Sequence, residues 1–77
     1  MKVDRELDCR GLLCPLPALE TRRALERCPP GTRLRVVCTD PAADLDLRAL
    51  CDETGDRFVA CVERDGELHL TIERRRA

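Results

Sequence analysis

The order in which two hydrophobic periods follow each other along the chain is the strongest constraint on its fold. Apolar residues alternate with polar ones in strand-like segments, and they return about every 3.6 residues in helix-like segments. The turn sequence Asp65-Gly66 joins the last two strand-like segments as a hairpin. Strands are predicted over residues 3–8, 33–38, 57–63 and 67–73, and helices over residues 15–28 and 41–54.

This β-α-β-α-β-β order predicts an α+β fold, a two-layer α/β sandwich. Each strand–helix–strand connection is expected to be right-handed, which places both helices on one face of a mixed four-stranded sheet. The other face is expected to be open to water, because the strands alternate rather than forming continuous apolar runs. With 77 residues, the chain is expected to be a single domain, residues 1–77.

Prolines, glycines and an aspartate are predicted to set the helix ends. Pro15 is expected at the first helical position, where its missing N–H would have no intrahelical partner. Pro29-Pro30-Gly31 should end that helix. Asp40 is a candidate N-cap for the second helix, and Gly55 fits its C-terminal cap.

The core must be built from aliphatic and cysteine side chains, because Phe58 is the one aromatic residue. We predict that Phe58, Ala60 and Val62 share one face of the third strand. Val37 is predicted to face outward from the second strand. The expected core positions on the helices and second strand are Ala18, Thr21, Ala24, Leu25, Cys28, Leu34, Val36, Cys38, Ala43, Leu47, Leu50, Cys51 and Thr54.

Cys14, in the run Cys14-Pro15-Leu16-Pro17, is the candidate reactive residue. A thiol at a helix start faces free N–H groups and the positive end of the helix dipole, which favour the nucleophilic thiolate. Since the two prolines lack N–H groups, the N–H of Leu16 is predicted to be the main donor to the sulfur. Gly11 lets the preceding loop bend away from it. The same pattern also fits a helix-start cysteine with an ordinary pKa.

The outward face of the first predicted helix is a candidate docking surface. Leu16 and Leu19 project there beside Arg22 and Arg23, close to Cys14. Exposed leucines next to a reactive thiol suit contact with a partner protein. Scattered surface leucines are also normal in proteins that bind nothing there.

Six cysteines allow several interpretations. A disulfide framework belongs to secreted proteins, and a zinc site would need Cys-x-x-Cys pairs or nearby histidines, so neither is predicted. Helical and strand periodicity instead places Cys28, Cys38 and Cys51 in the core. Cys9 is interpreted as a packing residue. The alternative is that Cys9 and Cys14 form a thiol–disulfide switch, or that Cys9 resolves a persulfide on Cys14.

Charge and hydropathy limit the remaining function classes. The net charge is −1 and aromatic stacking residues are missing, which argues against direct binding of nucleic acid. A regulatory binding module would rest only on the arginine-rich tail and first helix. No apolar run is long enough for a membrane span, and the charged N-terminus does not resemble a secretion signal. We therefore expect a cytoplasmic protein, by default a monomer.

The segment from Leu7 to Pro17 resembles the signature of the TusA/SirA-like sulfur carrier family, Leu-Asp-x-x-Gly-x-x-Cys-Pro-x-Pro. Thr39-Asp40-Pro41, Asp46-Leu47 and Thr54-Gly55 resemble the second block of that family. The similarity covers nearly the whole chain. One departure is Asp56, because many members of the family have histidine there.

The resemblance implies that Cys14 carries sulfur as a persulfide. Members of the family accept sulfur from a cysteine desulfurase or a rhodanese-type donor. They pass it toward tRNA 2-thiouridine synthesis, molybdenum cofactor assembly or sulfur oxidation. The expected role is that of a stoichiometric carrier rather than a free-standing enzyme. Attack of a thiolate on a persulfide requires no metal and no cofactor.

Overall fold

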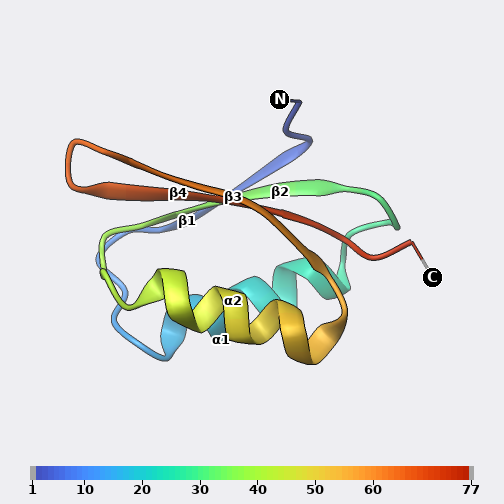
Figure 1. Cartoon of the computed structure of the whole chain (residues 1–77), viewed down its shortest axis with the longest axis horizontal. Helices are drawn as coiled ribbons and strands as arrows, with labels where there is room; N and C mark the ends of the chain where they lie inside the picture. The colour runs from blue at the N-terminus through green and yellow to red at the C-terminus, as the bar shows by residue number, and fades with distance from the viewer. Residues whose placement is uncertain (1, 77) are drawn as a thin grey trace.

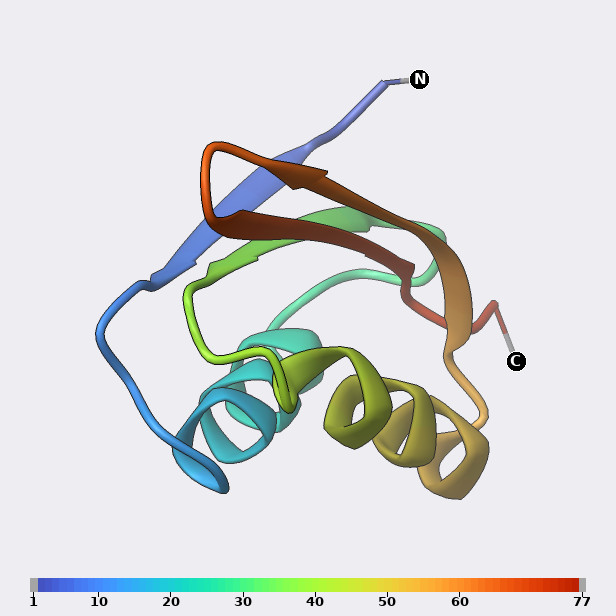
Figure 2. The ribbon, with the colours of Figure 1, turned by 60° about the vertical axis from the view of Figure 1, so that its left-hand side comes forward.

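Four strands form one mixed sheet, and two helices cover one of its faces (Figure 1). The computed structural model describes residues 2–76. The predicted order and the two-layer arrangement are confirmed (Figure 2). The elements are β1 (Arg5–Cys9), α1 (Leu16–Glu26), β2 (Arg33–Cys38), α2 (Ala43–Thr54), β3 (Arg57–Arg64) and β4 (Glu67–Glu73).

The strands lie in the order β1-β2-β4-β3. β1 is parallel to β2, and β4 is antiparallel to both β2 and β3. The two central strands are therefore β2 and β4, and they supply the middle of the core. Val36 on β2 faces its register partner Leu70 on β4, and both side chains are fully buried.

The core lies between the sheet and the two helices, and it is aliphatic and cysteine-rich as predicted. Cys38 and Cys51 belong to it, and Cys28 is buried at its border, where its thiol donates to the carbonyl of Ala24 at 3.2 Å. The buried cluster consists of Cys9, Leu25, Leu34, Val36, Cys38, Ala43, Leu47, Leu50, Cys51, Leu70 and Ile72.

A β-bulge makes one prediction for β3 wrong. Phe58 pairs with Ile72 on the core side, but the register shifts between Phe58 and Ala60. One extra residue reverses the alternation of every side chain that follows. Ala60 and Val62 therefore lie on the open face of the sheet, with Cys61 turned toward the core instead.

Val37 faces outward as predicted, yet it is only 7% exposed. Its register partners are Asp8 on β1 and His69 on β4. A residue on a central strand has neighbours on both sides, and their side chains cover it even where no helix does. The centre of the open sheet face is therefore less exposed to solvent than the alternation of polar and apolar residues alone indicates.

Both helix starts and the end of α1 differ from the prediction by one or two residues. Pro15 is the N-cap residue of α1 rather than its first helical residue, and Pro17 lies in the first turn. α1 ends at Glu26 and not at Cys28. Asp40 is not the N-cap of α2, because a turn intervenes and Ala42 takes that position.

The other predicted helix end is confirmed. Gly55 ends α2 in the left-handed conformation, with φ of 83°, and its N–H donates to the carbonyl of Cys51 at 2.8 Å. Glycine adopts this conformation without steric penalty, so it can end the helix and turn the chain toward β3.

Candidate functional site

The loop that carries Cys14 is fastened to the loop between β2 and α2. Both loops lie at the same end of the molecule (Figure 1). The N–H of Gly11 donates to the hydroxyl of Thr39 at 2.9 Å, and the N–H of Cys14 donates to Asp40 Oδ2 at 2.8 Å. The polar residues of the second loop therefore hold the backbone on both sides of the Leu12-Leu13 segment.

Asp40 links two backbone segments with one carboxylate. Besides the N–H of Cys14, it accepts the N–H of Ala42 at 3.0 Å just before α2. Hydrogen bonds from these two backbone groups lower the pKa of Asp40, because they stabilise its charged form. The residue predicted to cap α2 thus positions the Cys14 loop as well. Nothing in its sequence spacing indicated this second contact.

Cys14 lies exposed at the end of this loop, immediately before the N-cap of α1. The N–H of Leu16 donates to the carbonyl of Leu13 at 2.9 Å, so it is not the donor to the sulfur that the sequence predicted. The chain makes a tight turn before the helix begins, and this turn uses the N–H group internally.

The predicted stabilisation of a thiolate at Cys14 is wrong for the free protein. The pKa of Cys14 is raised, first by hydrogen bonding to the Asp46 carboxylate. Partial desolvation and the negative charges of Asp46 and Asp40 act in the same direction. Both aspartates come from the β2–α2 segment, so this effect depends on the tertiary structure. These contacts therefore disfavour the thiolate form of Cys14 in the free protein.

One oxygen of the Asp46 carboxylate has no hydrogen-bond partner in the part of the chain that the structure describes. Asp46 Oδ2 is buried, and no hydrogen bond of ordinary geometry reaches it within residues 2–76. The Asp46 carboxylate thus affects the pKa of the Cys14 thiol, but the thiol does not hydrogen-bond to Oδ2. An unsatisfied buried carboxylate oxygen is costly in a folded protein and calls for an explanation.

A groove of about 370 Å³ runs between α1 and α2, and Cys14 is part of its wall. Of the predicted docking residues, Leu19 and Arg22 line this groove, whereas Leu16 and Arg23 do not. Leu16 and Leu19 are 44% and 42% exposed. The wall consists of Cys14, Pro15, Ala18, Leu19 and Arg22 on one side and Asp46, Ala49, Leu50 and Glu53 on the other.

The sequence did not single out the α2 side of this groove. In the sequence, Asp46 was visible only in the Asp46-Leu47 part of the family resemblance, and Glu53 only as one of the acidic residues between positions 40 and 56. Two more exposed leucines were also missed, namely Leu13, at 70% exposure, and Leu45, at 74%. Leu13 lies in the loop before α1, where no periodicity applies, and Leu45 lies on α2 outside its buried residues Ala43, Leu47, Leu50 and Cys51.

Cys9 lies in the core and not at the groove. It is completely buried next to its register partner Cys38, and burial raises its pKa. All six cysteines are free. A disulfide between Cys9 and Cys14 would require Cys9 to leave the core, so the geometry does not favour the switch.

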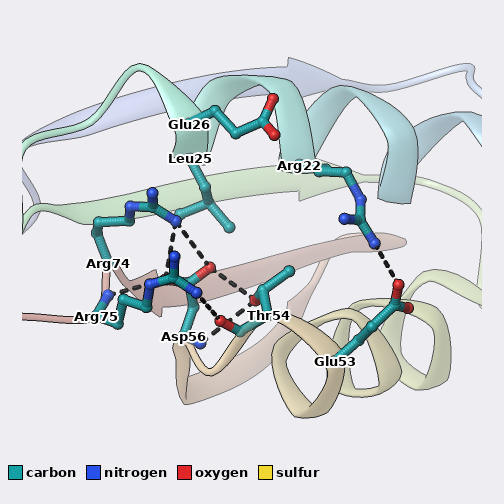
Figure 3. Close-up of a pocket in the computed structure, with 8 residues that line it drawn as sticks. All are labelled: Arg22, Leu25, Glu26, Glu53, Thr54, Asp56, Arg74 and Arg75. Carbon is teal, nitrogen blue, oxygen red and sulfur yellow. Dashed lines mark hydrogen bonds and ion pairs between the residues drawn. The ribbon is translucent and has the colours of Figure 1, made fainter. Parts of the chain in front are cut away.

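A second cavity, of about 250 Å³, surrounds Asp56 (Figure 3). The buried Asp56 carboxylate accepts the Thr54 hydroxyl at 2.7 Å and the N–H of Arg75 at 2.8 Å, and it pairs with the Arg74 guanidinium at 3.4 Å. Asp56 thereby ties the segment after β4 to the end of α2. This network explains what an aspartate does at a position where the resemblance implies histidine.

The fold and the surface cysteine at a helix start define a small α+β thiol protein, and comparison with known proteins places it in a family. The model of the family described as sulfurtransferase TusA matches residues 5–74. The chain therefore belongs to this family. Within residues 2–76, neither helix is long and apolar enough to cross a membrane.

Individual relatives agree with this assignment. The sulfur carrier protein TusA of Allochromatium vinosum is 37% identical over 92% of this chain and 93% of its own length. The putative sulfur carrier protein YrkI of Bacillus subtilis is 43% identical over 96% of this chain and 99% of its own length. A SirA-like protein from Desulfitobacterium hafniense has the same fold, with a TM-score of 0.82 over 94% of this chain and 99% of that one at 23% identity.

Proposed function

We propose that this protein is a sulfur carrier that holds sulfane sulfur as a persulfide on Cys14. The observation that carries the proposal is exposure, because Cys14 is the one cysteine of the six that is exposed. Its loop is anchored by Thr39 and Asp40, and it opens onto an apolar-walled groove suited to a partner. The relatives named as sulfur carriers support the same role.

The transfer step follows the chemistry of thiol–disulfide exchange. The Cys14 sulfur attacks the outer sulfur of a persulfide on the donor, and the sulfur–sulfur bond within the donor breaks. A new sulfur–sulfur bond forms on Cys14, and the thiol proton of Cys14 ends on the released donor thiol. Nothing is oxidised or reduced overall, and delivery to the acceptor is the same step in reverse roles.

The donor in this proposal is a cysteine desulfurase or a rhodanese-type protein, and the carrier acts stoichiometrically in the cytoplasm. The acceptor belongs to tRNA 2-thiolation, molybdenum cofactor assembly or sulfur oxidation. In each case the sulfur remains bound to protein, so the carrier must dock with both partners in turn.

Mass spectrometry tests the site directly. After incubation with a cysteine desulfurase and cysteine, Cys14 should gain the mass of one sulfur atom, and a reductant should remove it. Cys14→Ser should abolish the gain, whereas Cys28→Ser, Cys38→Ser and Cys51→Ser should retain it, because their thiols are buried. Added sulfur that persists in Cys14→Ser would show that Cys14 is not the persulfide site.

The outward face of α1, with Leu16, Leu19, Arg22 and Arg23, is the proposed docking surface. Changing both leucines to glutamine should slow sulfur transfer from the donor and leave thermal unfolding nearly unchanged, because both side chains are exposed. Val62→Thr is the matched control, since Val62 is 50% exposed but lies on the open face of the sheet. Equal transfer rates for the double variant and the control would remove this surface from the proposal.

A further inference from the structure

The groove between α1 and α2 contains a negative charge that lacks a cation. Three charged residues line the groove, namely Arg22, Asp46 and Glu53. Arg22 donates to Glu53 across the groove at 2.8 Å (Figure 3). No ion pair or hydrogen bond within residues 2–76 satisfies Asp46 Oδ2.

The nearest cation along α2 is also engaged. Arg48 donates to Asp44 at 2.8 Å and stacks over the ring of Phe58, with 4.2 Å between the guanidinium carbon and the ring centroid. Its position is therefore fixed by contacts away from the groove. Asp40, the other carboxylate that affects Cys14, is occupied by two backbone N–H groups.

Charge and shape of the groove together indicate what would fill it. Its walls next to Asp46 are largely apolar, with Ala18, Leu19, Ala49 and Leu50 among the lining residues. A lysine or arginine side chain has an aliphatic stem that packs on such walls and a charged end that pairs with a carboxylate. An acidic side chain would repel Asp46, and a neutral donor could hydrogen-bond to it but would leave its charge uncompensated.

We propose that the protein partner inserts a lysine or arginine side chain into this groove to pair with Asp46 beside the Cys14 sulfur, and that this pairing promotes sulfur transfer. This inference rests on the proposed function and names the chemistry of its partner. A cation at Asp46 draws the carboxylate away from the thiol proton and offsets the negative charge beside the sulfur. The thiolate then attacks the donor persulfide, and the proton ends on the released donor thiol.

In this arrangement Asp46 is a positioning residue that acts through Cys14. In the free carrier its negative charge disfavours the thiolate at the exposed sulfur, and the neutral thiol is a poor nucleophile toward small electrophiles. In the complex the same carboxylate binds the partner's cation next to the sulfur. One residue would thus suppress reaction in the absence of a partner and favour it in its presence.

The first test uses charged thiol reagents in place of the partner. A methanethiosulfonate with a trimethylammonium group and one with a sulfonate group both form a mixed disulfide with Cys14 and release a sulfinate. The ratio of the cationic rate to the anionic rate should fall about two- to fivefold in Asp46→Asn, the range expected for one partly exposed charge pair. Asp52→Asn removes an equal charge from the exposed side of α2, and it should leave the ratio nearly unchanged. An unchanged ratio in Asp46→Asn, or an equal fall in both variants, would overturn the proposal.

The second test separates Asp46 from a purely structural role. The pH profile of alkylation by neutral iodoacetamide should move to lower pH in Asp46→Asn, because the pKa of Cys14 falls when the carboxylate is removed. Loading by a cysteine desulfurase should nevertheless become slower than in Asp52→Asn. A more reactive thiol combined with slower loading is the expected signature, and loading as fast as in the control would contradict it. If the unchanged protein is not loaded at all, the proposed function fails, while the reagent ratio still decides whether the groove prefers cations.

Discussion

Replacement of Asp56 by alanine is predicted to lower stability without affecting the Cys14 loop. The Asp56 carboxylate is completely buried and accepts hydrogen bonds from Thr54 and from the backbone N–H of Arg75. It also pairs with the Arg74 guanidinium, whose side chain is 19% exposed. Alanine would remove the carboxylate that these three donors share, and it would release the segment after β4 from the end of α2 (Figure 3).

The loss of stability depends on how well water can hydrogen-bond to each donor once the carboxylate is removed. Leaving a buried donor without its partner costs about 1–3 kcal/mol. The donors around Asp56 lie near the surface, so water replaces part of what is lost, and we expect a total of about 2 kcal/mol. For a domain of this size that loss lowers the melting temperature by roughly 8–16 °C. Asp56→Asn keeps one acceptor oxygen and should lose about half as much.

Thermal and urea unfolding of the two variants would measure this loss. Asp52→Ala is the matched control, because Asp52 is exposed on α2 and should change stability by less than about 0.5 kcal/mol. The alkylation rate of Cys14 should be the same in all three proteins, since Asp56 does not line the α1–α2 groove. A loss below about 0.5 kcal/mol in Asp56→Ala would refute the view that this network holds the C-terminal segment.

Three further predictions concern the fold. Leu47→Ala should cost about 2–5 kcal/mol in urea unfolding, because Leu47 is fully buried in the core and alanine leaves a cavity. Gly11→Ala should lower stability by about 1–2 kcal/mol, because Gly11 has a φ of 81° although no atom blocks an added Cβ. The Arg10 guanidinium lowers the pKa of Asp8 to about 2. The stability that this contact gives is therefore complete above the unfolded pKa of about 3.9 and is lost as the pH falls toward 2. An NMR titration should show the low midpoint. Arg10→Ala should raise it only part of the way to the ordinary range, because the backbone N–H of residue 10 still donates to Asp8.

Local sequence signals were sufficient for the order of elements and for most of the core. Hairpin chemistry at Asp65-Gly66 and the glycine after α2 act within a few residues, so the sequence shows them directly. The periodicity of α2 placed Leu47, Leu50 and Cys51 correctly for the same reason. What these signals have in common is that each depends on a short stretch of backbone and on no distant partner.

The parts that sequence reasoning missed depend on contacts between distant segments. The bulge near Phe58 is compatible with the strand pattern on either side of it, and only pairing with β4 reveals it. The state of Cys14 was predicted from the helix start alone. Asp46, which is 32 positions away in the chain, reverses that effect through the tertiary structure. A local rule for thiol acidity fails wherever a neighbouring element adds its own charge.

The burial of four cysteines has a consequence for fidelity. Cys9, Cys28, Cys38 and Cys51 meet a sulfur donor only in molecules that have opened, so correct loading depends on an equilibrium as well as on recognition. At a stability of about 5 kcal/mol, about one molecule in several thousand is unfolded at any time. In the proposed function, a destabilised carrier would still receive sulfur at Cys14, but it would also collect sulfur at the wrong thiols. The amount of sulfur on the buried cysteines would then report on the unfolded fraction. Loading at the wrong cysteines would rise before the amount of sulfur loaded at Cys14 falls.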